Sequence, residues 1–280
     1  MLSQVWKSCH SSVCCLNFLN ERGVSIDTLT GFKVNHSLVT TDYAFYIPKA
    51  KKVEISFVDE DANTVVTSMR IPYQEFINDL RIGIFDNQTG YSIFKLDFPD
   101  FREIPGLKLC ERRKFQIGNE VVMLAFSSGC PNLSLRSGII SSFFSNSQGN
   151  RFFHFDGLSC LGNSGAPIID PENMQVIGIV SRRNTPASQS YKLLSDIITA
   201  NIDELSKTQG IVKYGDVDPI QVLIANQNQV KQLANNLYRY TAQGTTHVVM
   251  LDQILSYFNE NSSHEYNNER VKQEFDISLS

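Results

Sequence analysis

The stretch that decides the fold is FHFDGLSCLGNSGAPIID, residues 153–170, and its centre is the hexapeptide GNSGAP at 162–167. Glycines on both sides of a serine let the backbone turn tightly, so that consecutive N–H groups point into one pocket beside the Ser164 hydroxyl. Gly162, Asn163 and Ser164 would then form an oxyanion hole, with the N–H groups of Gly162 and Ser164 as donors. By itself the hexapeptide is also compatible with an ordinary turn, so the flanking sequence has to decide.

Short strand-like runs surround this turn. Up to about residue 185 the chain alternates between apolar or β-branched segments and turn residues, as in VCCLNFL (13–19), KVEISFV (52–58), NEVVMLAF (119–126), SGIISSFF (137–144) and QVIGIVS (175–181). Many short strands at this spacing indicate an all-β sandwich or a pair of barrels. A chain of 280 residues with 42% hydrophobic residues is long enough for one large all-β unit.

The character of the sequence changes after the last of these strands. Leu194, Ile197, Ile198 and Ile202 follow helical spacing, and a second stretch repeats apolar residues at Val230, Leu233, Ala234 and Leu237. We expect this second helix to bury Val230, Leu233 and Leu237 against a barrel or another copy of the chain. A final strand and a closing helix follow over 244–260, and the polar residues 261–280 are expected to form a flexible tail.

The composition argues against a nucleic-acid-binding, metal-binding or membrane protein. The net charge is −4, from 25 basic and 29 acidic residues, without the basic excess that tracks phosphates, so nucleic acid is not an expected partner. The six cysteines contain no CxxC pair, and the sequence implies no metal site and no cofactor. The first residues lack the pattern of a secretory signal, and no apolar run approaches the ~20 residues of a membrane span. We expect a soluble cytoplasmic protein with reduced thiols and no membrane contact.

The ordered motifs resemble the trypsin-like serine proteases, particularly the bacterial HtrA-type branch. The turn at 162–167 followed by QVIGIVS resembles the family's nucleophile loop and the strand after it. IGNEVVMLAFSSGCPNLSLRSGIISSF (117–143) is similar to a hairpin of the second barrel, and GTTHVVMLDQILSYF (244–258) is similar to the last strand and C-terminal helix. The resemblance implies two six-stranded antiparallel β-barrels over 1–184 and 244–260, interrupted by a partly helical insertion at 185–243.

The same resemblance assigns roles to individual residues. Ser164 takes the position of the nucleophile, and Leu158 falls at the base of the specificity pocket. Ser181, Arg182 and Arg183 fall on the strand whose backbone pairs with an extended substrate. An apolar pocket base would suit an apolar substrate side chain, whereas the arginines would favour acidic peptides unless they are simply a solvated surface pair.

Two catalytic positions do not match. TGFKVNHSLVTTDYAF (30–45) aligns with the family's TxxH segment, but Tyr43 stands where the general-base histidine belongs. GYSIFKL (90–96) aligns with the family's DxALLxL segment, but Gly90 stands where the aspartate belongs. A serine hydroxyl is a poor nucleophile without an adjacent base, and a tyrosine with a pKa near ~10 is a poor substitute for imidazole. We expect the Tyr43 side chain to lie in the cleft near Ser164.

Other residues offer weak substitutes for the missing base. His36 falls on a hairpin turn, His154 and His247 fall on strands of the second barrel, and His10 and His264 lie near the termini. We interpret Cys160 as a small buried residue of the nucleophile loop, because it lies four positions too early to be the nucleophile.

The sequence therefore predicts a trypsin-like fold that works as a pseudoprotease: a polypeptide-binding or regulatory module with a polypeptide or protein partner. The alternatives are an active serine endopeptidase with an unorthodox or partner-supplied base, or a chain whose Tyr43 and Gly90 are acquired substitutions. The insertion either covers the cleft or presents a helix to a partner, or it is only an appendage packed on the second barrel.

Overall fold

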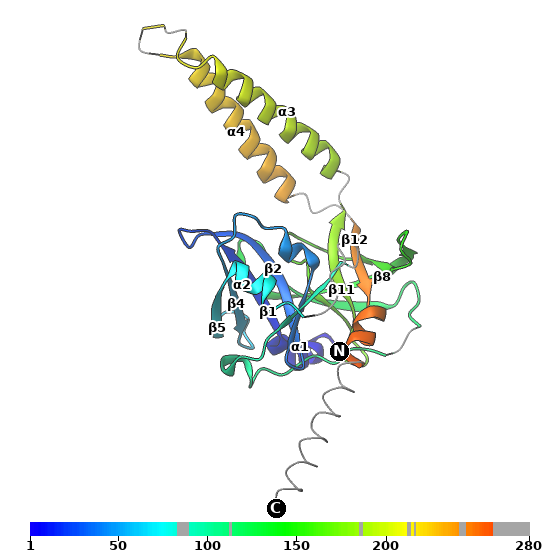
Figure 1. Cartoon of the computed structure of the whole chain (residues 1–280). Coiled ribbons are helices and arrows are strands. Elements are labelled where there is room, and N and C mark those ends of the chain that lie inside the picture. The colour runs from blue at the N-terminus through cyan, green and yellow to red at the C-terminus, as the bar shows by residue number, and fades with distance from the viewer. Residues whose placement is uncertain are drawn as a thin grey trace, which may run out of the picture. The chain divides into compact units, whose positions relative to one another are not determined.

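The computed structural model describes residues 1–82, 90–111, 114–184, 187–211, 214–215, 217–240 and 245–259. The chain divides into two compact units, one formed by Met1–Arg182 with the residues from Thr246 onward, the other by Arg183–Thr245. The first unit is mainly β and carries every predicted site residue except Arg183 (Figure 1). The second is a helical hairpin.

Six strands form the N-terminal sheet, in the spatial order β5-β4-β1-β2-β3-β6. Their bounds are Val13–Leu19 (β1), Ser25–Val34 (β2), Ser37–Thr40 (β3), Lys52–Val58 (β4), Val65–Pro72 (β5) and Ser92–Lys95 (β6). One face of the sheet surrounds a core that includes Leu16, Phe57, Phe76 and Phe94. Short helices α1 (Leu2–Cys9) and α2 (Tyr73–Asn78) and the 3₁₀ turns η1 (His10–Ser12), η2 (Asp42–Phe45) and η3 (Pro99–Phe101) complete this half.

The second set of six strands closes into a barrel, in the order β10-β11-β12-β9-β8-β7. Its strands are Glu120–Ser127 (β7), Cys130–Ser145 (β8), Arg151–Asp156 (β9), Pro167–Asp170 (β10), Gln175–Asn184 (β11) and Thr245–Met250 (β12). Its interior is filled by side chains that include Met123, Ile140, Phe153, Ile168 and Val248. Residues 252–259 continue as a helix after β12. The predicted mainly β fold with two sets of six strands is confirmed, and the structure adds that closure is complete only in the second set.

A third core joins the two halves of the β unit. Along β7, Val121, Met123 and Ala125 point into the second barrel, while Val122 and Leu124 point to the joint. On β1 the same alternation sends Leu16 into the first core and Val13 and Cys15 to the joint. These strands are apolar on both faces because each face is buried, which is why they appear in the sequence as continuous apolar runs.

The helical unit consists of α3 (Ala187–Lys207) and α4 (Pro219–Tyr240), which run antiparallel side by side (Figure 1). The sequence predicted both helices but with shorter lengths. Within the single chain Val230, Leu233 and Leu237 are not buried, since their exposed fractions are 47%, 59% and 62%, and their burial against a barrel or another copy stays a prediction. The other side of α4 contacts α3 instead. No helix in the described ranges is long and apolar enough to cross a membrane.

Candidate active site around Ser164

The Ser164 turn connects β9 to β10 and leaves two backbone donors available. Asn163 is fully buried, whereas Ser164 is half-buried. The N–H of Asn163 donates to the carbonyl of Cys160 at 3.2 Å, and that of Gly165 donates to Val180 at 2.6 Å. Within the described part of the chain, the N–H groups of Gly162 and Ser164 donate to no protein group. An oxyanion hole requires backbone N–H groups of this kind, which lie beside a serine hydroxyl and are not already hydrogen-bonded within the protein.

Asn163 has a different role from its two neighbours. Its Oδ1 accepts from the N–H of Cys160 at 2.6 Å, and its Nδ2 donates to the carbonyl of Phe126 at 2.6 Å. Its own backbone N–H is already engaged, so this residue does not supply an oxyanion donor. The buried amide instead ties the turn to the end of β7 and holds the flanking donors in place.

Thr30 of β2 links the turn to the first sheet, a role that sequence reasoning missed. Its N–H donates to the carbonyl of Ser164 at 3.0 Å, and its Oγ1 donates to the carbonyl of Gly162 at 2.8 Å. The same Oγ1 accepts from the N–H of Phe126 at 3.0 Å. Thr30 is fully buried, so these bonds fix the Ser164 turn against both halves of the β unit. Nothing local in the sequence distinguishes this threonine from others in strands.

Tyr43 lies in η2, two residues after Thr41, whose backbone N would lie 3.0 Å from a Cβ built on Gly165 of the Ser164 turn. The preceding Thr41 donates from its Oγ1 to the carbonyl of Ser181 at 3.3 Å and accepts from the N–H of Tyr43 at 3.3 Å. The Tyr43 side chain is 45% exposed. Partial burial raises the pKa of the phenol, and the charge and hydrogen bonding of Asp27 raise the pKa further. Among the described residues no hydrogen bond joins this phenol to Ser164.

These contacts make Tyr43 a worse base than a free tyrosine. Only the phenolate could take a proton from Ser164, and a raised pKa leaves less phenolate at neutral pH. The position expected to hold an imidazole therefore holds a neutral phenol that interacts with Asp27 of the first sheet.

Gly90 occupies the position predicted for the missing aspartate, and it packs against β11. A Cβ built on Gly90 would lie 2.4 Å from the Ser181 Oγ and 3.0 Å from the Ser181 Cβ. The backbone of Gly90 has φ +83°, a conformation that L side chains rarely adopt. Ser181 thus fills the space next to Gly90, and there is no room for a carboxylate without movement.

The residues predicted to bind substrate differ in their exposure to solvent. Leu158 is exposed, so its side chain does not form the enclosed apolar pocket base that we expected. Its carbonyl accepts from Arg136 Nη1 at 3.1 Å, and the same nitrogen donates to the Cys160 Sγ at 3.3 Å. Cys160 is therefore half-buried and held by an arginine, not fully buried. Ser181 is buried on β11, while the side chains of Arg182 and Arg183 lie outside the described residues.

The described histidines do not gather at Ser164. His10 stacks on Trp6 with ring centroids 5.3 Å apart, and His36 is exposed at the turn between β2 and β3. His154 and His247 are cross-strand neighbours on β9 and β12, with ring centroids 4.8 Å apart. His264 falls outside the described residues.

His154 gives the β unit a predicted dependence on pH. Burial lowers its pKa below 6.5, and its Nδ1 lies 2.6 Å from the Ser142 Oγ. Since the unfolded chain binds this proton more readily, stability is present above pH ~6.5 and falls as the pH drops below it. We expect the urea midpoint of the chain to fall between pH 7.5 and 5.5, and to fall less in a His154→Gln variant. An equal fall in both would contradict this assignment.

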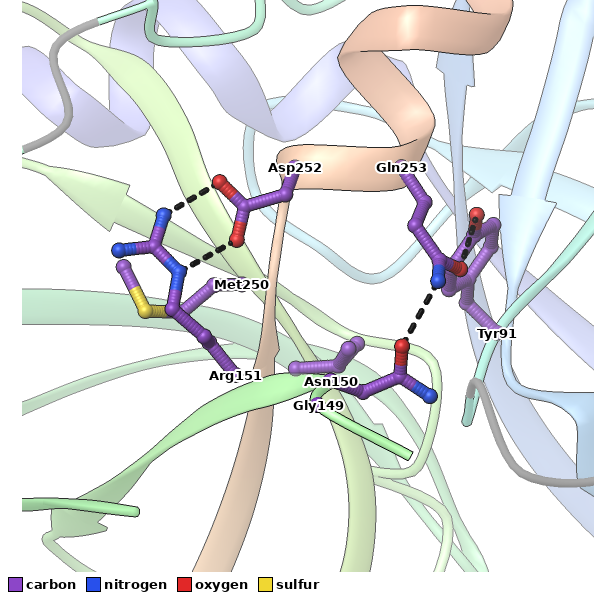
Figure 2. Close-up of a pocket in the computed structure, with 8 residues that line it drawn as sticks. Tyr91, Gly149, Asn150, Arg151, Met250, Asp252 and Gln253 are labelled. Atoms are coloured by element: carbon purple, nitrogen blue, oxygen red, sulfur yellow. Dashed lines mark hydrogen bonds and ion pairs between the residues drawn. The ribbon is translucent and has the colours of Figure 1, made fainter. Parts of the chain in front are cut away.

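A separate cavity of about 470 Å³ lies beside Tyr91, the neighbour of Gly90 (Figure 2). Gln253 Nε2 donates to Asn150 Oδ1 at 2.7 Å, and the Tyr91 hydroxyl donates to Gln253 Oε1 at 3.5 Å. Asp252 is paired with Arg151. None of the predicted site residues lines this cavity. Its polar groups hydrogen-bond to one another, and one of these bonds holds the Tyr91 hydroxyl. In the described ranges no three His, Cys, Asp or Glu side chains gather as metal ligands.

Comparison with solved structures gives distant similarities. They include a protease from M. tuberculosis in its active form (18% identity, 64% of this chain and 73% of that chain, TM-score 0.46). Another is Deg5, with 15% identity over 64% of this chain and 83% of that chain and a TM-score of 0.47. A third is a serine endoprotease from Yersinia pestis, with 17% identity over 65% of this chain and 57% of that chain and a TM-score of 0.47. No curated protein sequence matches the chain.

The family model described as "Trypsin-like peptidase domain" matches residues 30–179. This range starts at the threonine that holds the nucleophile turn and contains Tyr43, Gly90 and Ser164. It covers more than half of the sequence. The chain belongs to the trypsin-like peptidase family.

Proposed function

We propose that this protein is a pseudoprotease that binds extended polypeptides beside the Ser164 turn without cleaving them. The observation that carries the proposal is the pairing of Tyr43 with Asp27. A phenol with a raised pKa stands where the family places its general base, and a neutral phenol is a poor acceptor for the proton of the Ser164 hydroxyl. Gly90, packed on Ser181, supplies no group to orient a base.

The binding half of the proposal rests on β11. In the family the backbone of this strand pairs with an extended substrate, and here the strand reaches Asn184. The carbonyl of Ser181 already accepts a hydrogen bond from Thr41, which fixes the strand against the first sheet. A strand held at Ser181, together with the two backbone N–H groups of Gly162 and Ser164 that donate to no described protein group, suits recognition of a peptide backbone through main-chain hydrogen bonds.

Incubation with an unfolded polypeptide tests the predicted binding, and incubation with a fluorophosphonate probe tests the predicted lack of catalysis. We expect β-casein to bind the chain and its Ser164→Ala variant equally, in biolayer interferometry, because binding does not need the hydroxyl. We expect no casein fragments and negligible labelling of Ser164, since loss of triad residues leaves only about 10³–10⁴-fold acceleration over water.

Two results would count against the proposal. Strong labelling that disappears in Ser164→Ala would favour an active endopeptidase whose base comes from a partner or an unorthodox group. Absence of casein binding by a folded chain would remove the polypeptide-binding role.

A further inference from the structure

The helical unit is fastened internally through one side of each helix. The rings of Tyr191 and Tyr238 stack with centroids 4.4 Å apart, and Lys231 Nζ donates to Thr199 Oγ1 at 2.7 Å. Ile198 of α3 is 3% exposed. On α4 the less exposed positions recur every three or four residues, at Ile220, Ile224, Gln227, Lys231, Ala234 and Tyr238. The side of α4 that faces α3 is thereby defined.

A second row of apolar residues lies on a flank of this contact side. On α4 it contains Leu223, Val230, Leu233 and Leu237, and on α3 it contains Leu194 and Ile197, all of them exposed. Successive residues are rotated by about 100° around the helix axis. On this basis the exposed apolar row of each helix lies roughly 60–140° around the axis from the side that contacts the other helix, and the direction of rotation is the same in both helices. In two antiparallel helices the same sense of rotation brings both flanks to one broad face of the hairpin. We call these six residues the apolar face.

The opposite broad face of the hairpin is polar. By the same rotation it carries Lys192, Asp196 and Asp203 from α3, and Gln221, Asn228 and Gln232 from α4, all exposed. One broad face of the hairpin is therefore apolar and the other is polar, and both are separate from the sides through which the two helices contact each other. A two-helix unit has no third layer of its own to cover an apolar face.

The spacing on α4 indicates what kind of surface would cover this face. Leu223, Asn226, Val230, Leu233 and Leu237 follow one another at intervals of three and four, the heptad pattern of a helix that packs along another helix. From Pro219 to Tyr238 the only charged residue is Lys231, which points at Thr199 of α3. The rim of the seam consists of amides such as Gln229 and Asn236.

We propose that the apolar face binds the apolar face of a second copy of this chain, so that two hairpins form a four-helix bundle. The α4 row is uncharged and offers nothing to complement a charged partner, whereas a second copy presents the same uncharged row without like-charge repulsion. On α3 the acidic residue of this flank, Glu204, lies at its outer edge and is paired with Lys207. Pairing would remove on the order of 1,000 Å² of accessible surface, about the size at which specific interfaces begin. A two-fold arrangement uses the same patch on both copies and closes the assembly at two chains.

Sedimentation of the full chain at several concentrations tests the proposal. We expect a two-chain mass at tens of micromolar and dissociation on dilution. A Leu233→Asp variant places a charge in the centre of the seam, and its dissociation constant should rise by at least ~10²-fold, so that it sediments as one chain. The matched control is Gln232→Asp, which adds the same charge one residue away on the polar face and should sediment like the unmodified chain.

Circular dichroism of each variant separates loss of pairing from loss of the helices. A one-chain mass for the unmodified protein at all concentrations would overturn the proposal, and the apolar face would then be left to another part of the chain or a different protein. A dimer that survives Leu233→Asp, or that is equally lost in Gln232→Asp with the helical signal intact, would overturn it as well. The deciding readout is the mass of the assembly, so the result is independent of whether the Ser164 site binds polypeptide.

Discussion

A Gly165→Ala variant should fail to assemble the two halves of the β unit. A Cβ at this position would lie 2.1 Å from the carbonyl oxygen of Thr30 and 2.2 Å from the Thr40 Oγ1, both on strands of the first sheet. The backbone of Gly165 has φ +88°, so the substitution adds strain to a steric clash. We expect a loss of more than ~4 kcal/mol in the free energy of unfolding, a large part of the ~5–15 kcal/mol of a typical domain.

Gly149→Ala is the matched control for this experiment. Gly149 also has a positive φ, +83°, but nothing lies within 4 Å of a Cβ built on it. Its substitution should cost only the ~1–2 kcal/mol of a left-handed alanine. Urea unfolding followed by tryptophan fluorescence measures both variants. If the two lose equal stability, the close approach of the Ser164 turn to the first sheet is wrong.

A histidine at position 43 should have the largest effect on the reactivity of Ser164. We expect Tyr43→His to raise the rate of fluorophosphonate labelling of Ser164 by up to about 10²-fold, the difference between losing a histidine and losing an aspartate from a serine triad. Gly90→Asp alone should change nothing, because a carboxylate without an imidazole has no base to orient.

The structure also predicts that adding Gly90→Asp to Tyr43→His brings little further gain. The new Cβ would lie 2.4 Å from the Ser181 Oγ, at a backbone conformation that suits glycine. A third substitution, Ser181→Gly, removes the obstructing hydroxyl, and the triple variant should label fastest. Labelling that is as fast in the double variant as in the triple would show that Ser181 does not fill the aspartate position. No gain from Tyr43→His would mean that residue 43 does not reach Ser164.

Several features of the site follow from local sequence alone. Glycines on both sides of a serine specify a tight turn wherever they occur, so the candidate oxyanion donors Gly162 and Ser164 could be named without a structure. Strand-length apolar runs separated by turn residues predicted the mainly β fold. The departures at Tyr43 and Gly90 are visible because the segments around them keep their pattern.

Other features depend on residues that are far apart in the sequence. The role of Asn163 depends on Phe126, which lies 37 residues earlier. The row of α4 that contacts α3 could not be named from the sequence, because an amphipathic pattern does not reveal which of two rows a neighbouring helix will cover. Here α3 covers the row that ends with Ala234 and Tyr238.

By itself the sequence determined the family's strand pattern and the Ser164 turn, and it predicted the two departures at Tyr43 and Gly90, since each is encoded in consecutive residues. Only the tertiary structure decided what occupies those positions. Burial and the neighbouring Asp27 raise the pKa of Tyr43, and Ser181 fills the space beside Gly90. Such contacts are set by packing between strands that are neighbours in space and distant along the chain, and no local pattern specifies them.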